Sequence, residues 1–195
     1  MRLNKKKTII TGAGTGIGRA IAERFCIEGA EVMVAEIETK GGEETVKQII
    51  KSGGTAIFQK TDTSKEDSVQ SMIESTVSEF GGIDIVINNA AAFVFGSIED
   101  TGPEEWTKVL SVNVQGYANT IKSALPFLKK SNKAAIVNVA SVSSFIAQPE
   151  FLPYNTSKGA VSQMTRCLAM DLAKYNIRVN AVCPGAIYTR ASERH

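Results

Sequence analysis

The sequence is poor in histidine and cysteine, the residues that most often serve as metal ligands. Of its 195 residues only one is histidine, His195 at the end of the chain, which argues against a histidine-based triad and against a zinc site. Cys26, Cys167 and Cys183 are an odd number at wide spacing. We therefore expect reduced thiols packed as small apolar groups, with no disulfide framework and no metal site.

The chain also lacks an excess of charge of one sign and any long apolar run. Lysine plus arginine number 22 against 20 aspartate plus glutamate, and this net charge of +2 gives no signature of a nucleic-acid partner. No apolar run reaches membrane-spanning length. We therefore expect a cytoplasmic protein without a nucleic-acid or membrane partner, folded as one domain over residues 1–195.

Short β-branched runs alternate with amphipathic segments along the chain. The runs that predict strands are residues 7–11, 31–36, 55–61, 83–88, 134–139 and 178–183. The segments that predict helices are residues 16–28, 43–52, 65–80, 103–130 and 154–175. This alternation predicts an α/β fold, a doubly wound parallel sheet of the Rossmann type with helices on both faces. Right-handed crossovers and a switch after the third strand predict the order 3-2-1-4-5-6.

A glycine-rich run follows the first predicted strand and leads into a predicted helix. Its glycines are Gly12, Gly14, Gly16 and Gly18. Glycine permits sharp turns and close approach to a phosphate, and the first amides of a helix attract anions, so the run is typical of a pyrophosphate site. A triphosphate-binding loop would need Gly-Lys-Ser/Thr at its end, and the chain does not supply it. A glycine-rich turn without a ligand is the alternative.

Glu36 closes the second predicted strand, eighteen residues past Gly18. In a doubly wound sheet the ligand lies beyond the carboxyl ends of the strands, where a carboxylate can accept hydrogen bonds from the adenosine ribose. A 2′-phosphate there would meet a like charge at a cost of roughly 1 to 4 kcal/mol. The neighbouring Ile37 offers no arginine to offset that cost. The pattern favours NAD over NADP, with a solvated strand-end glutamate as the alternative.

Tyr154 and Lys158 are four positions apart in the last predicted helix and so lie on one of its faces. A unit charge about 4 Å from the phenol, at an effective dielectric of about 20, is worth roughly 4 kcal/mol, or roughly 3 pKa units. We therefore expect Lys158 to lower the pKa of Tyr154 from about 10 toward neutral pH and to make it a general base. On spacing alone, a solvated pair is the alternative.

These motifs together resemble those of the short-chain dehydrogenase/reductase family, in its single-domain branch, over residues 7–190. The family pattern Thr-Gly-x3-Gly-x-Gly stands here as Thr11, Gly12, Gly16 and Gly18. Asn88-Asn89-Ala90 resembles the family's Asn-Asn-Ala-Gly segment, with Ala91 in place of the glycine. That replacement narrows the room for close approach of the backbone to a cofactor.

The resemblance implies hydride transfer between NAD(H), or less favourably NADP(H), and a secondary alcohol or ketone, without a metal. The catalytic residues that it implies are Asn113, which holds a water for proton relay, Ser141, which orients the substrate oxygen, Tyr154, the acid/base, and Lys158, which also binds the nicotinamide ribose. The cofactor-binding residues that it implies are Gly12, Gly14, Thr15, Gly16, Ile17, Gly18, Glu36, Asp62, Thr63, Asn89, Ala90, Ala91, Tyr154, Lys158, Pro184, Gly185, Ile187 and Thr189.

Single motifs also have plain structural interpretations, such as Asp62 as a helix N-cap and Asn88 and Asn89 as turn residues. Two other functions stay open at this point. A dinucleotide-binding sensor or interaction protein would keep the fold without turnover. A nucleotide-sugar epimerase or dehydratase shares the Tyr-x3-Lys pair, but normally has a Gly-x2-Gly-x2-Gly loop and a larger C-terminal domain.

The chain ends at His195, a few residues after the segment that resembles the nicotinamide turn. Because members of the family continue through a substrate-covering loop, another helix and a seventh strand, we expect residues 1–195 to lack these parts. The resemblance also implies a homodimer or homotetramer of the full-length form. An apolar or ring-bearing alcohol or ketone is favoured by the apolar residues expected near the pocket, with a core or an interface as the alternative for such a cluster: Phe93, Phe95, Phe145, Ile146, Phe151 and Tyr188.

Overall fold

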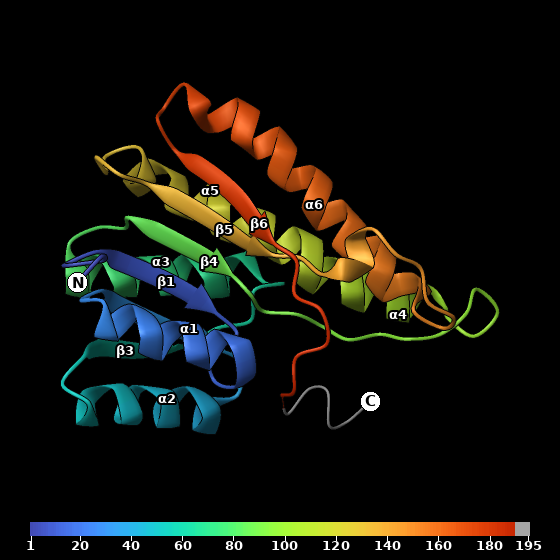
Figure 1. The fold of residues 1–195 in the computed structure, drawn as a ribbon, viewed down its shortest axis with the longest axis horizontal. Coiled ribbons are helices and arrows are strands. Elements are labelled where there is room, and N and C mark those ends of the chain that lie inside the picture. The colour runs from blue at the N-terminus through green and yellow to red at the C-terminus, as the bar shows by residue number, and fades with distance from the viewer. Residues whose placement is uncertain (190–195) are drawn as a thin grey trace.

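The computed structural model describes residues 1–189, and six parallel strands form its central sheet (Figure 1). The strands are β1 Lys7–Thr11, β2 Glu31–Glu36, β3 Thr55–Lys60, β4 Ile85–Asn88, β5 Ala135–Val139 and β6 Arg178–Val182. Their order, β3-β2-β1-β4-β5-β6, confirms the prediction. Residues 190–195, which the single-domain expectation includes, lie outside the described residues.

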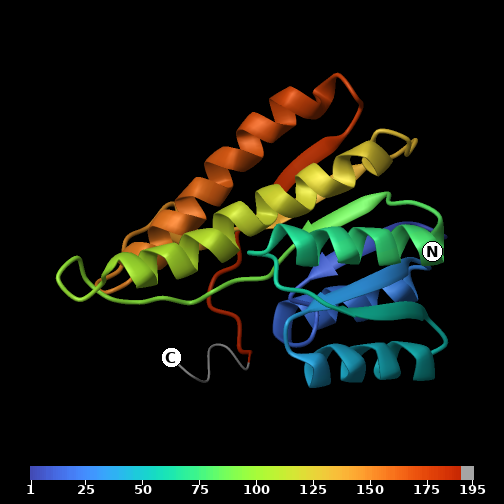
Figure 2. The ribbon, with the colours of Figure 1, turned by 180° about the vertical axis from the view of Figure 1, so that it is seen from behind.

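Helices cover both faces of the sheet. The helical segments are α1 Gly16–Ile27, α2 Thr39–Lys51, α3 Glu66–Phe80, α4 Pro103–Leu110, the π-helical η1 Ser111–Gln115, α5 Gly116–Leu128, the 3₁₀-helical η2 Val142–Ser144 and α6 Leu152–Ala173. α1 lies in front of the sheet in Figure 1, whereas α3 (teal) and α5 (yellow-green) lie in front of it in Figure 2, which is the view from behind. The two faces therefore carry separate helical layers, as a doubly wound sheet requires.

Alternation of side chains along each strand divides the core between these layers. The neighbours Ile9 and Ile10 in β1 are both fully buried but belong to different clusters. Ile9 packs in the cluster that includes Met72 of α3 and Leu128 of α5, and Ile10 in the cluster that includes Ala22 of α1. A strand that is apolar on both faces explains why the predicted strands read as continuous β-branched runs.

The predicted helices 16–28, 65–80 and 154–175 agree with the structure to within two residues at each end, whereas the other two differ more. The segment 103–130, predicted as one helix, is interrupted by the π-helical turn η1. α2 begins at Thr39 and not at residue 43, because its glycines serve close packing and do not end the helix. A Cβ on Gly42 would overlap the ring of Phe58, and one on Gly41 would lie 3.2 Å from the carbonyl oxygen of Gly14.

No helix among residues 1–189 is long and apolar enough to cross a membrane. The carboxyl ends of all six strands point to one edge of the sheet because every pairing is parallel. Strands β2 and β3 are added on one side of β1, whereas β4, β5 and β6 are added on the other. This change of side leaves a crevice beside the carboxyl ends of β1 and β4.

Candidate functional site

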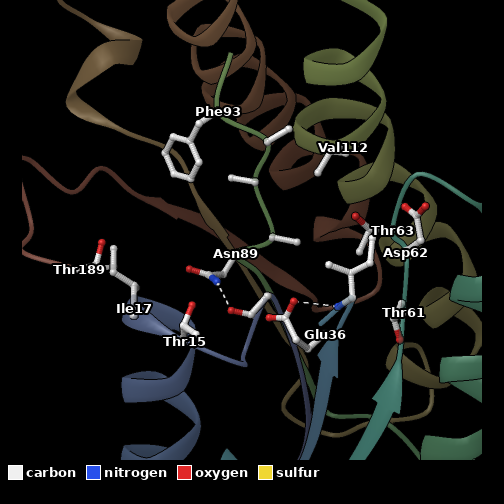
Figure 3. A pocket seen from close by; sticks show the side chains of 16 residues that line it. Thr15, Ile17, Glu36, Thr61, Asp62, Thr63, Asn89, Phe93, Val112 and Thr189 are labelled. Carbon is white, nitrogen blue, oxygen red and sulfur yellow. Dashed lines mark hydrogen bonds between the residues drawn. The ribbon is translucent and has the colours of Figure 1, made fainter. Parts of the chain in front are cut away.

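A cavity of about 390 Å³ opens at this crevice (Figure 3). It is lined by Gly12, Thr15, Gly16, Ile17, Glu36, Ile37, Thr61, Asp62, Thr63, Asn89, Ala90, Ala91, Ala92, Phe93, Val112 and Thr189. Figure 3 shows Glu36 and Asp62 toward one end of the cavity, Phe93 and Thr189 toward the other, and Asn89 between them. Residues that are far apart in the sequence therefore meet at the carboxyl edge of the sheet, as predicted from their positions at strand ends.

The glycine-rich turn after β1 is compact because several of its positions leave no room for a side chain. A Cβ on Gly18 would overlap the carbonyl oxygen of Gly12, and Gly12 itself has a φ of +65°. Asn89 fixes the turn from the β4 side, since its Nδ2 donates to the carbonyl oxygens of Thr11 and Gly12, each at 3.0 Å. The turn delivers Gly16 and Ile17, the first residues of α1, to the cavity wall.

The N-terminus of α1 makes no capping hydrogen bond with the side chain of its N-cap, Thr15. A helix start has unpaired backbone N–H groups and a partial positive charge, both of which attract anions. Thr15, Gly16 and Ile17 all line the cavity, so this end of the helix faces the space where a ligand would lie. The residues present thus fit a pyrophosphate group at the mouth of α1.

Glu36 holds the glycine turn and lines the cavity at the same time. Its Oε2 accepts a hydrogen bond from the amide of Gly14 at 2.9 Å, and its Oε1 accepts from the amides of Ile37 at 2.8 Å and Glu38 at 3.1 Å. A Cβ on Gly14 would lie 2.6 Å from the Cγ of Glu36, so a side chain there would displace the Glu36 carboxylate. Amide contacts on both oxygens fix the carboxylate at the end of β2.

Two of the plain structural interpretations are wrong. Asp62 is not a helix N-cap: the N-cap of α3 is Lys65, and Oδ1 of Asp62 instead accepts from the amide of Ser64 at 3.0 Å. Asn88 is not a turn residue but the fully buried last residue of β4. Its Nδ2 donates to Oδ1 of Asn138 in β5 at 3.0 Å, so Asn88 ties two strands together beneath the cavity.

Asn113 lies in the π-helical turn η1, and its side chain clamps the loop that follows β4. Oδ1 accepts from the amide of Ala92 at 2.7 Å, while Nδ2 donates to the carbonyl oxygen of Ala92 at 3.0 Å. Nδ2 also donates to Oγ of Ser157 in α6 at 3.0 Å. The side chain is fully buried, and these three contacts connect the cavity wall to α6.

Tyr154, Lys158 and Ser141 come together where α6 meets the carboxyl end of β5. Nζ of Lys158 lies 5.8 Å from the centroid of the Tyr154 ring, which confirms that the two side chains share one face of the helix. Ser141 is the N-cap of η2, two residues after the end of β5, and its hydrogen bond lowers the pKa of Tyr154. The structure therefore brings these three predicted residues into one cluster.

The expectation that Lys158 lowers the pKa of Tyr154 to near neutrality is wrong. Burial of the phenol is the larger effect and raises the pKa of Tyr154, and the hydroxyl of Ser141 lowers it by less. Lys158 is 2% exposed, and its ammonium donates to the carbonyl oxygen of Val139 at 2.8 Å. Burial lowers the pKa of Lys158 from its ordinary value of 10.5 to about 8.

The segment after β6 contributes to the cavity through Thr189, whose side chain faces Gly16. The predicted residues Pro184, Gly185 and Ile187 do not line the cavity, and Ile187 is half exposed. The carbonyl oxygen of Pro184 accepts from the amide of Val142 at 3.0 Å, which joins this turn to η2.

Comparisons with known proteins agree with this geometry. The family model described as short chain dehydrogenase matches residues 6–195. The chain belongs to the short-chain dehydrogenase family. It is accordingly an oxidoreductase of a family whose members use NAD or NADP.

Two relatives and one solved structure show how close this short-chain dehydrogenase is to known members. An uncharacterized oxidoreductase of Thermotoga maritima is 41% identical over 185 residues, which cover 95% of this chain and 73% of that protein. The NADP-dependent (R)-specific alcohol dehydrogenase of Lentilactobacillus kefiri is 40% identical, over 96% of this chain and 75% of that protein. The 3-ketoacyl-(acyl-carrier-protein) reductase of Brucella melitensis, complexed with NADH, is 35% identical with a TM-score of 0.92 and covers 96% of this chain and 78% of its own.

Four cavity residues of this short-chain dehydrogenase were not predicted as site residues: Ile37, Thr61, Ala92 and Val112. Each is next to a predicted or cavity-lining residue in the sequence. Ile37 and Thr61 follow directly after β2 and β3, so the rule that ligands bind beyond carboxyl strand ends could have found them. Val112 lies in η1 beside the predicted residue Asn113, but no sequence signal indicates the π-helical turn that brings it to the cavity.

Proposed function

We propose that this chain interconverts a secondary alcohol and a ketone with NAD(H) as cofactor and Tyr154 as the general acid/base. The observation that carries the proposal is the cluster of Tyr154, Ser141 and Lys158 beside the cavity. The ring of Tyr154 stacks on that of Phe93, which lines the cavity, with 5.3 Å between the ring centroids. A phenol at this place is one side chain away from the space in which a ligand would bind.

The residues of the cavity fit a dinucleotide along its length. Gly16 and Ile17, at the start of α1, would hold the pyrophosphate, and Glu36 would accept hydrogen bonds from the adenosine ribose. Asp62 and Thr63 border the same end, and Thr189 the opposite one. When bound, the nicotinamide ring supplies the carbon that gives or takes a hydride.

Glu36 supports NAD over NADP. Its carboxylate is fixed by the amides of Gly14 and Ile37, so it is unable to turn away from a 2′-phosphate without breaking these contacts. Relatives in the family differ in this respect, because one is named as NADP-dependent and another was solved with NADH. The choice therefore depends on residues of this chain, and a carboxylate at the end of β2 repels the extra phosphate.

Tyr154 holds the proton that the reaction requires. Because burial raises the pKa of Tyr154, the phenol is protonated at neutral pH and can donate from its Oη to a carbonyl oxygen in reduction. Removal of a proton from an alcohol needs the phenolate, so oxidation is favoured as the pH rises. Ser141 orients the substrate oxygen through its hydroxyl, and Lys158 places a positive charge beside the phenol.

Asn113 contributes to this site by holding other residues in place. Its side chain is fully engaged by Ala92 and Ser157, so it fixes the loop after β4 against α6. Oγ of Ser157 in turn donates to the carbonyl oxygen of Tyr154 at 2.7 Å. We propose that a water needed for proton relay would be held by the backbone of the π-helical turn around Asn113, where the helical hydrogen-bond pattern changes.

We also propose a homodimer or homotetramer that pairs through α4, α5 and α6. A shallow depression between these helices contains the apolar residues Leu110, Val114, Ala118 and Ala160. Leu110 is 37% exposed. Sedimentation equilibrium should show a dimer or tetramer that Leu110→Glu dissociates, because a buried unpaired carboxylate opposes association. A monomeric unsubstituted chain would contradict this assembly.

Replacement of Tyr154 by phenylalanine tests the proposed chemistry. Tyr154→Phe removes the hydroxyl but keeps the ring, so reduction of acetophenone or 2-butanone by NADH should fall at least about 100-fold. Binding of NADH, followed by its fluorescence, should stay unchanged. Tyr175→Phe is the matched control, because Tyr175 follows the distant end of α6 and contacts Lys129. Turnover of Tyr154→Phe within a few-fold of the unsubstituted chain would overturn the assignment.

A further inference from the structure

Four aromatic rings meet between the loop after β4 and the start of α6. Phe93 and Tyr154 are stacked, with an interplanar angle of 18° and 5.3 Å between centroids. Phe95 lies on the same tyrosine at 5.8 Å and tilted by 59°, and it contacts Phe151 at 4.4 Å. Both geometries are favourable for aromatic pairs. Tyr154 is therefore held on one side by a flat ring and on another by an inclined ring.

The backbone that carries Phe93 and Phe95 is anchored at both ends. Asn113 binds both the amide and the carbonyl oxygen of Ala92, directly before Phe93. Gly96, directly after Phe95, donates from its amide to the carbonyl oxygen of Glu150 and accepts from the amide of Leu152 at 3.3 Å. These hydrogen bonds fix segment 92–96 across the start of α6. The positions of the Phe93 and Phe95 rings against Tyr154 are therefore set by the backbone.

Gly96 is required for this path. Its φ is +148°, and a Cβ there would lie 2.6 Å from the side chain of Thr101. The residue pairs with Phe151 in an isolated parallel bridge. A side chain at position 96 would displace the bridge and, with it, the ring of Phe95 that lies on Tyr154 and Phe151.

Phe93 differs from a core phenylalanine because its ring contacts another side chain and also borders the cavity. One is the Tyr154 ring, and the other is the cavity, which Phe93 lines together with Asn89 and the alanines that follow it. Its side chain remains 40% exposed. Figure 3 shows the ring at the end of the cavity that also contains Thr189, away from Glu36. A flat apolar surface thus borders the part of the cavity beside the phenol.

We propose that Phe93 is a positioning and specificity-determining residue: its ring fixes the orientation of the Tyr154 phenol and forms an apolar wall that selects ring-bearing ketones and alcohols. The inference rests on the proposed function, because it assigns Tyr154 the acid/base role. A ring-bearing substrate gains an aromatic contact that an aliphatic one lacks, which corresponds to about two- to tenfold in affinity.

Binding of two ketones that differ in one ring tests the wall without any need for turnover. Dissociation constants of acetophenone and 2-butanone are measured by calorimetry in the presence of saturating NAD⁺. The unsubstituted chain should bind acetophenone more tightly than 2-butanone. Phe93→Leu should reduce the ratio of the two affinities about two- to tenfold, and Phe93→Tyr, which keeps a ring, should leave it unchanged. Tyr175→Leu is the control, because Tyr175 is 38% exposed, similar to Phe93, and follows the distant end of α6.

Three results would overturn the wall: equal affinity of the unsubstituted chain for both ketones, binding of neither, or an unchanged ratio in Phe93→Leu. An equal change in Tyr175→Leu would also overturn it, because the effect would then not depend on the position of the ring. None of these results depends on the chemistry of Tyr154. Failure of the proposed function would instead appear as retained turnover in Tyr154→Phe.

A phenolate titration tests the positioning role. Ultraviolet absorbance of each chain is followed against pH, and subtraction of the titration of the same chain with Tyr154→Phe added isolates the signal of Tyr154. Because burial raises the pKa of Tyr154, loss of the covering ring in Phe93→Leu should move its ionisation to lower pH, and Phe93→Tyr should leave it in place. An unchanged midpoint in Phe93→Leu would show that the ring does not set the surroundings of the phenol.

Discussion

Lys158 donates a hydrogen bond from Nζ to the carbonyl oxygen of Val139, at 2.8 Å. The hydroxyl of Tyr117 donates to the same oxygen at 3.1 Å, so one backbone acceptor at the end of β5 serves two buried side chains. The ammonium therefore has a polar partner, although its surroundings are apolar enough to lower its pKa to about 8. Burial of a charged lysine therefore destabilises the folded state relative to the unfolded chain.

We predict that Lys158→Met removes this cost and that the gain depends on pH. The folded-state pKa of about 8 lies below the ordinary value of 10.5, so the unfolded chain binds more protons between these pH values. The stability of the unsubstituted chain relative to Lys158→Met should therefore rise by about 3 kcal/mol from pH 7 to pH 10.5. Urea unfolding of both chains across this range measures the difference.

The control for this prediction is Lys122→Met, which replaces an exposed lysine of α5 whose ammonium stays in water. Its free energy of unfolding should run parallel to that of the unsubstituted chain from pH 7 upward. If Lys158→Met also runs parallel, burial of Lys158 does not disfavour its charged form, and the proposed electrostatic cost is absent.

Glu36 should decide the preference between NADH and NADPH. The unsubstituted chain should bind NADH at least about fivefold more tightly, which corresponds to about 1 kcal/mol of repulsion. Glu36→Gln keeps an oxygen that can accept from Gly14 but removes the charge, so the preference should shrink toward unity. Fluorescence titration with each cofactor gives the ratio. Glu31→Gln, at the opposite end of β2, should keep the original preference.

Two glycines in helices should respond to alanine in opposite ways. A Cβ on Gly18 would overlap the backbone of Gly12, so Gly18→Ala should lower the free energy of unfolding by roughly 1 to 3 kcal/mol and weaken NADH binding. Nothing lies within 4 Å of a Cβ on Gly159, in the interior of α6. Gly159→Ala should therefore stabilise the fold by about 1 kcal/mol. Equal thermal shifts would show that the glycine turn can relax around a methyl group.

The strand order and the location of the cavity could be predicted because they depend on patterns that repeat along the chain. Runs such as residues 32–35 are apolar on both faces, which is typical of a parallel strand covered by helices. Glu36 ends one strand, and Asp62 and Asn89 follow two others; parallel pairing places such residues at one edge of the sheet. A single topological rule then brings them together without any knowledge of side-chain contacts.

Details that depend on the backbone path could not be predicted. The sequence around Asn113 contains serine, valine and glycine, which are weak helix formers but do not by themselves mark a π-helical turn. The partner of Lys158 is the carbonyl oxygen of Val139, a group that every residue carries and that no motif identifies. Spacing predicts the pKa shift of Tyr154 with the wrong sign, because it gives the distance between two side chains but not the depth at which they are buried.

Asn113→Ala should destabilise the fold by roughly 2 to 4 kcal/mol. The substitution removes one buried hydrogen bond, to Ser157, and two partly buried ones, to the amide and carbonyl of Ala92. An unsatisfied buried polar group costs about 1 to 3 kcal/mol. Asn119→Ala is the control, because the Asn119 side chain is buried on α5 and donates to the carbonyl oxygen of Thr63 at a longer 3.3 Å. Urea unfolding should show a smaller loss for Asn119→Ala.

The same two variants should differ in the ionisation of Tyr154. Because Ala92 precedes Phe93, Asn113→Ala should move the titration midpoint of Tyr154, whereas Asn119→Ala should not. The same midpoint in both variants would mean that the hydrogen bonds of Asn113 to Ala92 do not affect the phenol.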